Sequence, residues 1–190
     1  METKTIRIIG GKYRGKKLFQ PETGDVRPMV DRLKESLFNI LSTKVYGSVV
    51  LDLFGGSGGL GLEALSRGAG AVYIADKHPL SIRAMRKNVE SLKQITHPAG
   101  AGCVMIINND YLQTLNDFFS QKLTFDIIFL DPPYASDFAE QALKKIKEYG
   151  LLNKGGVIVW HHLAVQKIKN CPFAVNDERV YGEKMISFLN

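Results

Sequence analysis

The sequence predicts an α/β fold with a mostly parallel sheet, and three observations support this prediction. Short apolar runs alternate with amphipathic segments between residues 48 and 160, which is the pattern of repeated strand–helix units. A glycine-rich loop follows the first of these runs, at residues 55–61. Beyond residue 172, two further apolar segments predict a β-hairpin, so one strand should run antiparallel near the end of the sheet.

The elements before the sheet are a basic hairpin and a helix. Residues 5–19 combine apolar and basic side chains, and turns are expected at Gly10-Gly11 and Gly15. A loop is expected over residues 20–28. Apolar residues then recur at helical spacing, which predicts an amphipathic helix: Val30, Leu33, Leu37, Ile40 and Leu41.

The sheet and its helices follow. We expect strands at residues 48–54, 71–75, 103–108, 125–130 and 156–160, and helices at residues 60–67, 79–94, 111–121 and 136–148. Pro79 suits the first turn of its helix, where the missing N–H costs no hydrogen bond. In the tail, residues 173–175 and 184–189 are expected to pair as two strands joined through Tyr181-Gly182.

The size and composition of the chain indicate a single domain. Its 190 residues can bury one sizeable core, with residues 1–43 as a basic extension and residues 44–190 as the strand–helix core. No apolar run approaches the roughly 18–20 residues of a membrane span. The first residues lack the apolar region of a signal peptide. We therefore expect a cytoplasmic monomer without membrane attachment.

The cysteines and histidines form neither a disulfide framework nor a metal site. Cys103 and Cys171 lie far apart in the sequence, and Cys103 falls in an apolar strand. His161 and His162 are adjacent on an expected strand, so their side chains should point to opposite faces and could not readily hold one ion. We interpret both histidines as structural residues and expect no metal.

The most informative segment is Asp131-Pro132-Pro133-Tyr134, directly after the apolar run at residues 127–130. The Asp131 carboxylate and a carbonyl of the turn could each accept an N–H from the exocyclic amine of a nucleobase. Tyr134 could stack on the base, and such stacking contributes roughly 1–3 kcal/mol. The prolines fix φ and remove competing N–H donors. The alternative is a strand that simply ends in a Pro-Pro stop.

The glycine-rich loop predicts a nucleotide-type site. Gly55-Gly56-Ser57-Gly58-Gly59-Leu60-Gly61 joins a strand to a helix, and the missing side chains let the backbone approach a ligand. The loop satisfies the dinucleotide fingerprint, so NAD must be considered beside a purely structural turn. Asp52, four residues before Gly56, argues against NAD, because a carboxylate there would repel a pyrophosphate. It would attract the sulfonium and ammonium groups of S-adenosylmethionine.

Asp76 adds to this interpretation. It ends the next expected strand, twenty positions after Gly56, where an acid suits the two hydroxyls of a ribose. The loop alone is a weak signal, but Asp52, the loop, Asp76 and the turn at Asp131 together strongly indicate a site for S-adenosylmethionine and an amine.

Basic residues are concentrated near the amino terminus. Residues 1–34 hold nine Lys and Arg against four Asp and Glu, a charge of +5 out of the total of +6. Clustered cations supply sequence-independent affinity for phosphates, so we favour a nucleic-acid contact over a merely solvated basic hairpin. Tyr13, between Lys12 and Arg14, could stack on an unpaired base.

Over nearly its full length, the chain resembles the bacterial small-subunit ribosomal RNA guanine-N2 methyltransferases of the RsmD type. The resemblance rests on residues 7–15 (RIIGGKYRG), 27–35 (RPMVDRLKE), 51–58 (LDLFGGSG), 61–69 (GLEALSRGA) and 131–134 (DPPY). It implies a Rossmann-like, seven-stranded methyltransferase sheet of order 3-2-1-4-5-7-6 with one antiparallel strand. It also implies methyl transfer from S-adenosylmethionine to the N2 amine of one guanine in 16S rRNA, in an assembling 30S subunit.

The motifs and the resemblance together assign roles to particular residues. The catalytic turn would consist of Asp131, Pro132, Pro133 and Tyr134. The cofactor would lie against Asp52, Phe54, Gly56, Ser57, Gly58, Gly61, Asp76, Asn109 and Asp110. Asp110 would face the adenine amine or, alternatively, cap the next helix. RNA would contact Arg7, Lys12, Arg14, Arg27 and Arg32, although Arg32 could instead pair with Glu35 on the helix surface.

Some positions depart from the family pattern. Met29 stands where the family usually has threonine, and the second strand ends in Ala75-Asp76 where a Val-Glu pair is usual. Asp76 could then hold the ribose from a position shifted by one. No acid follows residues 157–159, because Trp160-His161-His162 occupies the end of that strand.

Two other functions remain open. The catalytic turn also permits methylation of adenine N6 or cytosine N4 in DNA or another RNA, which the amino-terminal segments disfavour. The third hypothesis is a non-catalytic RNA-binding assembly factor with a vestigial fold, which should lack micromolar affinity for S-adenosylmethionine. Because the chain is small, we expect proteins of the 30S particle to help define the substrate.

Overall fold

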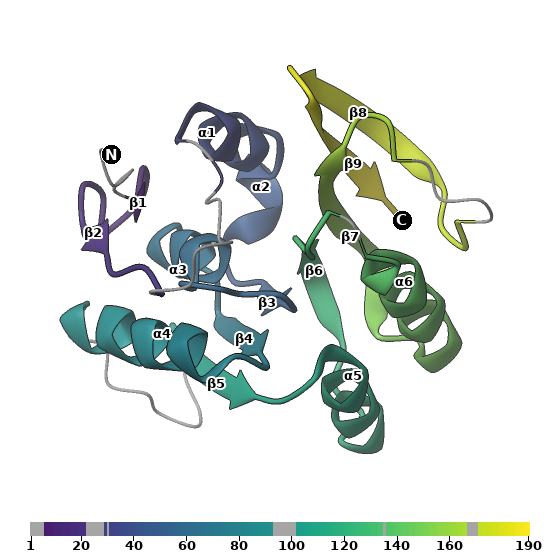
Figure 1. The fold of residues 1–190 in the computed structure, drawn as a ribbon, viewed down its shortest axis with the longest axis horizontal. Coiled ribbons are helices and arrows are strands. Elements are labelled where there is room, and N and C mark those ends of the chain that lie inside the picture. The colour runs from purple at the N-terminus through teal and green to yellow at the C-terminus, as the bar shows by residue number, and fades with distance from the viewer. Residues whose placement is uncertain (1–5, 22–28, 30, 93–101, 135, 167–170) are drawn as a thin grey trace.

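A seven-stranded sheet forms the centre of the molecule (Figure 1). The computed structural model describes residues 6–21, 29, 31–92, 102–134, 136–166 and 171–190. The strands of the sheet are β3 (Val49–Asp52), β4 (Ala71–Asp76), β5 (Cys103–Asn108), β6 (Phe125–Leu130), β7 (Leu152–Leu163), β8 (Val175–Tyr181) and β9 (Lys184–Leu189). They lie in the order β5-β4-β3-β6-β7-β9-β8, and β9 is antiparallel to both of its neighbours. Numbered from β3, this is the predicted order 3-2-1-4-5-7-6, which is confirmed.

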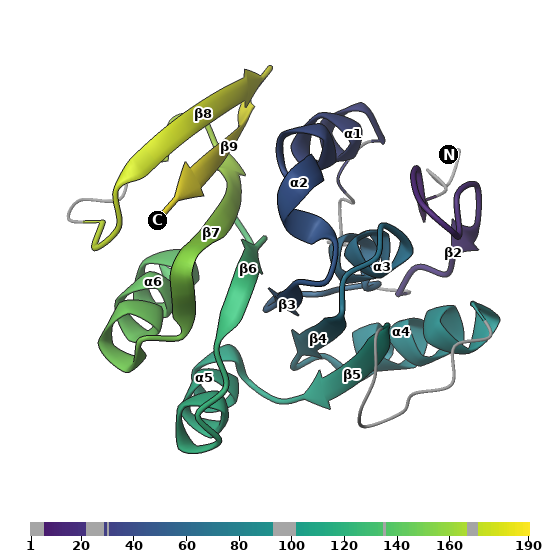
Figure 2. The same ribbon diagram turned by 180° about the vertical axis from the view of Figure 1, so that it is seen from behind.

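Helices cover both faces of the sheet, as Figure 2 shows from behind. One face carries α1 (Asp31–Ile40), α3 (Gly59–Ser66) and α4 (Pro79–Ser91), and the other carries α5 (Tyr111–Ser120) and α6 (Phe138–Tyr149). The short α2 (Ser42–Val45) precedes β3. Successive strand residues alternate between the two cores, because side chains of a strand point to opposite faces. In the part of the chain that the structure describes, no helix has both the length and the apolar character needed to cross a membrane.

β7 and β8 differ most from their predicted bounds, while β3 is shorter than predicted and β4 is one residue longer. β7 begins at Leu152 rather than at residue 156, because Leu152 already pairs with Phe125 of β6. Gly155, with φ of +79°, does not end the strand but lies in a bulged section where the register with β6 shifts. It also continues to Leu163 instead of ending at residue 160. β8 covers Val175–Tyr181 rather than residues 173–175. β8 is an edge strand whose side chains are mostly exposed, so it lacks the apolar alternation on which the prediction relied.

The basic hairpin is anchored on α3 and lies beside it in Figure 1. Its strands are β1 (Ile6–Arg7) and β2 (Lys17–Leu18). Glu63, which is fully buried on α3, accepts the backbone N–H groups of Ile9 and Gly10, each at 2.8 Å. The Ser66 hydroxyl donates to the Gly10 carbonyl at 2.6 Å, and the Ser66 carbonyl accepts the N–H of Lys12 at 2.7 Å. The first family segment therefore packs against the end of α3.

A glycine substitution tests this anchoring. Gly11 has a φ of +72°, and a Cβ there would lie 1.9 Å from the Ser66 carbonyl oxygen. Gly15 has a similar φ of +85°, but among the described residues no atom lies within 4 Å of such a Cβ. Because only Gly11 adds a clash with backbone, we expect Gly11→Ala to lower the free energy of unfolding by roughly 1–3 kcal/mol more than Gly15→Ala. Urea unfolding of both variants measures the difference, and equal losses would contradict the anchoring.

Candidate active site

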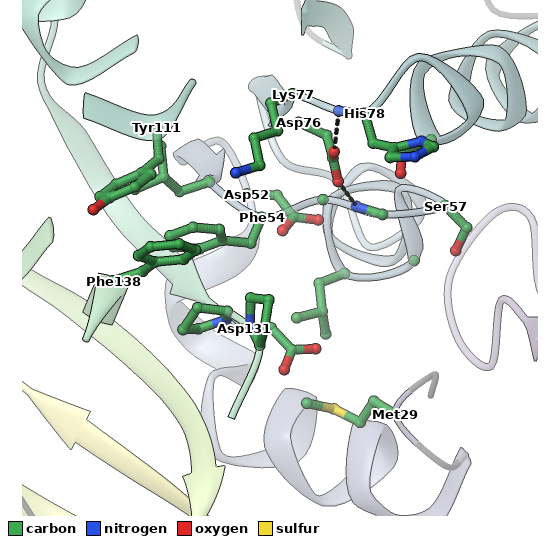
Figure 3. A pocket seen from close by; sticks show the side chains of 18 of the residues that line it. Met29, Asp52, Phe54, Ser57, Asp76, Lys77, His78, Tyr111, Asp131 and Phe138 are labelled. Carbon is green, nitrogen blue, oxygen red and sulfur yellow. Dashed lines mark hydrogen bonds between the residues drawn. The ribbon is translucent and has the colours of Figure 1, made fainter. Parts of the chain in front are cut away.

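A cavity of about 600 Å³ opens where β3, β4 and β6 end (Figure 3). Its wall includes Asp52 from β3, Asp76 from β4 and Asp131 directly after β6. Because these strands are parallel neighbours, their carboxyl ends meet at one edge of the sheet. Of the four acids predicted at strand ends, Asp52, Asp76 and Asp131 therefore share one cavity, which has the size of a small-molecule site, whereas Asp110 is not among the residues that line it.

Asp52 is almost completely buried. Its Oδ2 accepts the backbone N–H of Gly61 at 2.9 Å. Burial is the main cause that raises the pKa of Asp52 to about 7; the Gly61 N–H opposes this shift, and the nearby charges of Asp131 and Asp76 contribute to it. A carboxyl with this pKa can ionise readily when a cation binds beside it.

The glycine loop lies along the same cavity. Gly56, Ser57 and Phe54 line it, while Gly58 immediately precedes α3. Gly61 lies in the first turn of α3, where a Cβ would come within 2.8 Å of the Ile74 side chain on β4. The missing side chain therefore lets α3 pack directly on β4 and hold the Gly61 N–H against Asp52.

Asp76 is fixed by two backbone donors. Its Oδ2 accepts the N–H of Gly56 at 2.9 Å, and its Oδ1 accepts the N–H of His78 at 2.7 Å, as the dashed lines in Figure 3 show. The preceding residue, Ala75, is buried in the hydrophobic core. The acid at the end of β4 is therefore Asp76, and its carboxylate is oriented on the rim of the glycine loop.

The two residues after β5 differ in their surroundings. Asn109 lines the cavity, and its amide donates to Asp117 Oδ2 at 3.2 Å. Asp110 is the N-cap of α5, where its Oδ1 accepts the N–H of Leu112 at 3.0 Å. Asp110 is not among the residues that line the cavity, so the helix-capping alternative is the one that the structure supports.

An aromatic wall forms a further side of the cavity. The rings of Phe54 and Phe138 are parallel within 5° at 6.5 Å, and the Tyr111 ring lies 5.2 Å from that of Phe54 (Figure 3). The Lys77 ammonium lies 5.4 Å from the centroid of the Phe138 ring. Sequence reasoning identified only Phe54. Tyr111 and Phe138 each begin a helix that follows a strand, and this position at the carboxyl edge could have revealed them.

All four residues of the predicted catalytic turn line the cavity. The backbone carbonyl of Tyr134 accepts a hydrogen bond from Gln166 Nε2 at 2.6 Å. The Lys184 ammonium lies 5.4 Å from the centroid of the Tyr134 ring. Residues of β9 and of the segment after β7 thus support the turn that follows β6.

The sequence prediction did not place His161 beside this turn. Its Nδ1 lies 2.7 Å from Asp131 Oδ1, and its ring packs edge-on against Tyr134 with centroids 5.6 Å apart. Leu130 pairs with Trp160 in the parallel register of β6 and β7, so Asp131, directly after β6, lies next to His161 of β7. The contact follows from this register, and no sequence motif indicates it.

The amino-terminal extension closes another side of the cavity. Ile6, Met29 and Lys34 line it, and Met29 is buried in the core. Lys34 is buried as well; its Nζ donates to the Arg7 carbonyl at 2.5 Å and lies 3.6 Å from Glu63 Oε2. Burial lowers the pKa of Lys34, although the Glu63 carboxylate opposes this shift.

The predicted RNA-contacting residues lie in different surroundings. Arg7 forms an exposed ion pair with Asp31 at 2.7 Å. Lys12 and Arg14 are exposed on the hairpin. Arg32 lies on the exposed side of α1, where it lines a shallow groove together with Glu35 and Arg179. Arg27 lies outside the described residues.

Known proteins are similar to this chain over nearly its whole length. Residues 6–190 match the family described as Conserved hypothetical protein 95. The chain is 33% identical over 181 residues to ribosomal RNA small subunit methyltransferase D of Escherichia coli (strain K12), an alignment that covers 94% of this chain and 86% of that protein. It superposes on the structure of a hypothetical protein of Thermus thermophilus with a TM-score of 0.80 and 29% identity, over 96% of this chain and 98% of that one.

A more distant structure shares the fold. The 16S rRNA N2 G1207 methyltransferase (RsmC) of T. thermophilus, solved in complex with AdoMet and guanosine, is 22% identical, with a TM-score of 0.70 over 97% of this chain and 49% of that one. The family match and the E. coli relative extend across the hairpin, the cavity and the catalytic turn. The chain therefore belongs to the family described as Conserved hypothetical protein 95, which is the RsmD family of methyltransferases.

Proposed function

We propose that this protein transfers a methyl group from S-adenosylmethionine to the N2 amine of one guanine in 16S rRNA, within the assembling 30S subunit. The observation that carries the proposal is that Asp52, Asp76 and the turn beginning at Asp131 line a single cavity. The E. coli relative is named as a methyltransferase of small-subunit ribosomal RNA, which supports the RNA class. The complex of the T. thermophilus enzyme with AdoMet and guanosine supports the pair of ligands.

The residues of the cavity fit S-adenosylmethionine. When bound, this cofactor supplies a methyl group made electrophilic by a sulfonium. Ionised Asp52 would attract the cationic methionine part, and Asp76 would accept hydrogen bonds from the ribose hydroxyls. The parallel rings of Phe54 and Phe138 suit a flat adenine, and Asn109 lines the same cavity. A pyrophosphate fits this cavity poorly, because three carboxylates line its wall.

The catalytic turn would prepare the target amine for attack. Asp131 and the Pro132 carbonyl would each accept one N–H, which favours a pyramidal nitrogen whose lone pair faces the methyl carbon. Tyr134 would stack on the base and hold its plane. As the nitrogen–carbon bond forms and the carbon–sulfur bond breaks, positive charge develops on nitrogen, and Asp131 stabilises it. The methylated amine can then lose its proton to water, so a strong general base is not required.

The amino-terminal extension would serve the RNA side of the reaction. We propose that Arg7, Lys12, Arg14, Arg27 and Arg32 contact phosphates around the target nucleotide. Since Ile6 and Lys34 of the same extension line the cavity, binding of RNA to the hairpin would bring the substrate close to the catalytic turn.

A labelling experiment tests the proposal. Tritiated S-adenosylmethionine is incubated with the protein and either 30S particles or naked 16S rRNA, both from cells that lack this protein, and the digested nucleosides are separated by chromatography. Label in N2-methylguanosine, stronger with the particles, is the expected result. Label in N6-methyladenosine or N4-methylcytidine would agree with methyl transfer to an exocyclic amine but would contradict guanine as the target base. Tight particle binding without label would favour the non-catalytic assembly factor, and equal turnover on naked rRNA would contradict a role for ribosomal proteins.

Cofactor affinity should depend on pH through Asp52. Because the pKa of Asp52 is raised to about 7, the carboxyl is largely protonated at pH 6 and must lose its proton to bind a cation. We therefore expect affinity for S-adenosylmethionine to rise about tenfold from pH 6 to pH 8, with proton release on binding. Isothermal titration in buffers of different ionisation enthalpy measures both effects. Asp52→Asn should bind weakly and lose the pH dependence; an unchanged dependence in this variant would assign it to another group.

A further inference from the structure

His161 is a buried histidine that the mechanism above does not use. Its side chain is 1% exposed, and it contacts the two side chains of the catalytic turn that would handle the base. Nδ1 lies 2.7 Å from Asp131 Oδ1, and the imidazole meets the Tyr134 ring edge-on at an interplanar angle of 80°. One side chain of the neighbouring strand therefore touches both the carboxylate and the ring of the turn.

The chemistry of the two groups determines the direction of the hydrogen bond. An ionised carboxylate can only accept, so Nδ1 of His161 must donate its N–H to Oδ1. The Asp131 side chain nevertheless remains 26% exposed and lines the cavity, which leaves Oδ2 as the oxygen available to a ligand. Nε2 lies 3.5 Å from the Tyr134 hydroxyl, at the outer limit of a hydrogen bond, so ring packing is the main contact with Tyr134.

We infer, resting on the proposed function, that His161 is the positioning residue of the catalytic turn. It holds the plane of the Asp131 carboxylate so that Oδ2 meets an N–H of the exocyclic amine, and it packs against the ring that stacks on the base. Without this hydrogen bond, the carboxylate can rotate and reaches the productive geometry less often. The loss falls on the chemical step, because the cofactor and the RNA are bound by other residues.

The adjacent histidine provides a matched comparison. His162 is equally buried, at 1% exposure, and lies on the opposite face of β7. Its Nε2 lies 2.9 Å from the Ser187 hydroxyl, and its ring stacks on Trp160 with centroids 3.5 Å apart. His162 therefore has the same residue type, strand and burial as His161, but its contacts lie away from the catalytic turn.

Three variants test the inference by steady-state methyl transfer to the accepted substrate. His161→Leu removes the donor, and we expect its kcat to fall about 10- to 100-fold while KM for S-adenosylmethionine and for RNA stays within about twofold. His161→Asn places an amide N–H near the position of Nδ1 and should recover most of that loss. His162→Leu should reduce stability but leave the kcat of the folded protein near that of the wild type. An unchanged kcat in His161→Leu, or no recovery in His161→Asn, would overturn the inference.

Nitrogen-15 NMR of the histidine rings separates this inference from the proposed function, because it requires no turnover. We expect the His161 ring to carry its proton on Nδ1, with a downfield proton signal that disappears in Asp131→Ala and is assigned by its absence in His161→Asn. A proton only on Nε2, or a signal unchanged by Asp131→Ala, would overturn the inference even in an active enzyme. If the wild type transferred no methyl group, the proposed function and the positioning role of His161 in it would fail together, and the contact with Asp131 would stand as structural.

Discussion

We expect Asp131→Asn to transfer methyl groups about 10²–10³ times more slowly than the wild type, with little change in KM for S-adenosylmethionine. Asparagine has the shape of aspartate but one acceptor oxygen and no charge. Because His161 Nδ1 donates at 2.7 Å, the amide oxygen would turn toward His161, and the amide NH₂ would face the substrate amine. Two donors would then oppose each other where charge develops on nitrogen. Measurement of kcat on 30S particles gives the size of the effect.

Asp137→Asn serves as the control for this substitution. Asp137 lies at the start of α6, where it accepts a hydrogen bond from Gln141 at 2.7 Å, and it is not among the residues that line the cavity. The Asp137 side chain makes no hydrogen bond to the helix backbone, so Asp137→Asn should change kcat by less than about twofold. Equal rates for Asp131→Asn and the wild type would remove the catalytic turn from the mechanism.

We expect Glu63→Ala to lower the free energy of unfolding by about 3–5 kcal/mol. The Glu63 carboxylate is fully buried, accepts two backbone N–H groups of the hairpin and an N–H of Arg67 at 2.8 Å, and lies 3.6 Å from Lys34 Nζ. The substitution would leave these donors without their acceptor, and Lys34 would be a buried cation without its counter-charge. Lys34 also lines the cavity, so cofactor affinity should fall as well. Urea unfolding followed by circular dichroism measures the loss.

The exposed pair of Glu140 and Lys144 gives the contrast. These side chains meet at 2.9 Å one turn apart on α6, and both are more than a third exposed. Since exposed pairs contribute little, Glu140→Ala should cost less than about 1 kcal/mol. If Glu63→Ala cost no more than this control, the hairpin would not depend on Glu63 for its attachment to α3.

The strands of the sheet could be predicted because local sequence features mark them, whereas their order was an implication of the family resemblance. Apolar runs, the glycine loop and the helix start at Pro79 are all features of neighbouring residues, and parallel strand ends then place Asp52, Asp76 and Asp131 at one edge. The bounds of the edge strand β8 could not be predicted in this way, because its exposed side chains carry no apolar pattern.

The remaining features depend on contacts between distant residues. From the sequence alone, Glu63 resembles a solvent-exposed helix residue. It is buried because the hairpin covers it, and the residues that contact it, Ile9 and Gly10, lie 54 and 53 positions earlier in the chain. His161 meets Asp131 only through the register of β6 with β7. The ambiguity of Asp110 has another origin, since a helix cap and a ligand contact require the same carboxylate at the same place after a strand.

A structure of the protein with S-adenosylhomocysteine and guanosine tests the central claim most directly, since this cofactor product cannot donate a methyl group. The account predicts that the cofactor sulfur faces the Asp131 turn, that Asp76 binds the ribose hydroxyls, and that the guanine N2 amine donates to Asp131 Oδ2 and the Pro132 carbonyl. A cofactor bound outside the cavity of Asp52 and Asp76, or a guanine whose amine points away from Asp131, would contradict it.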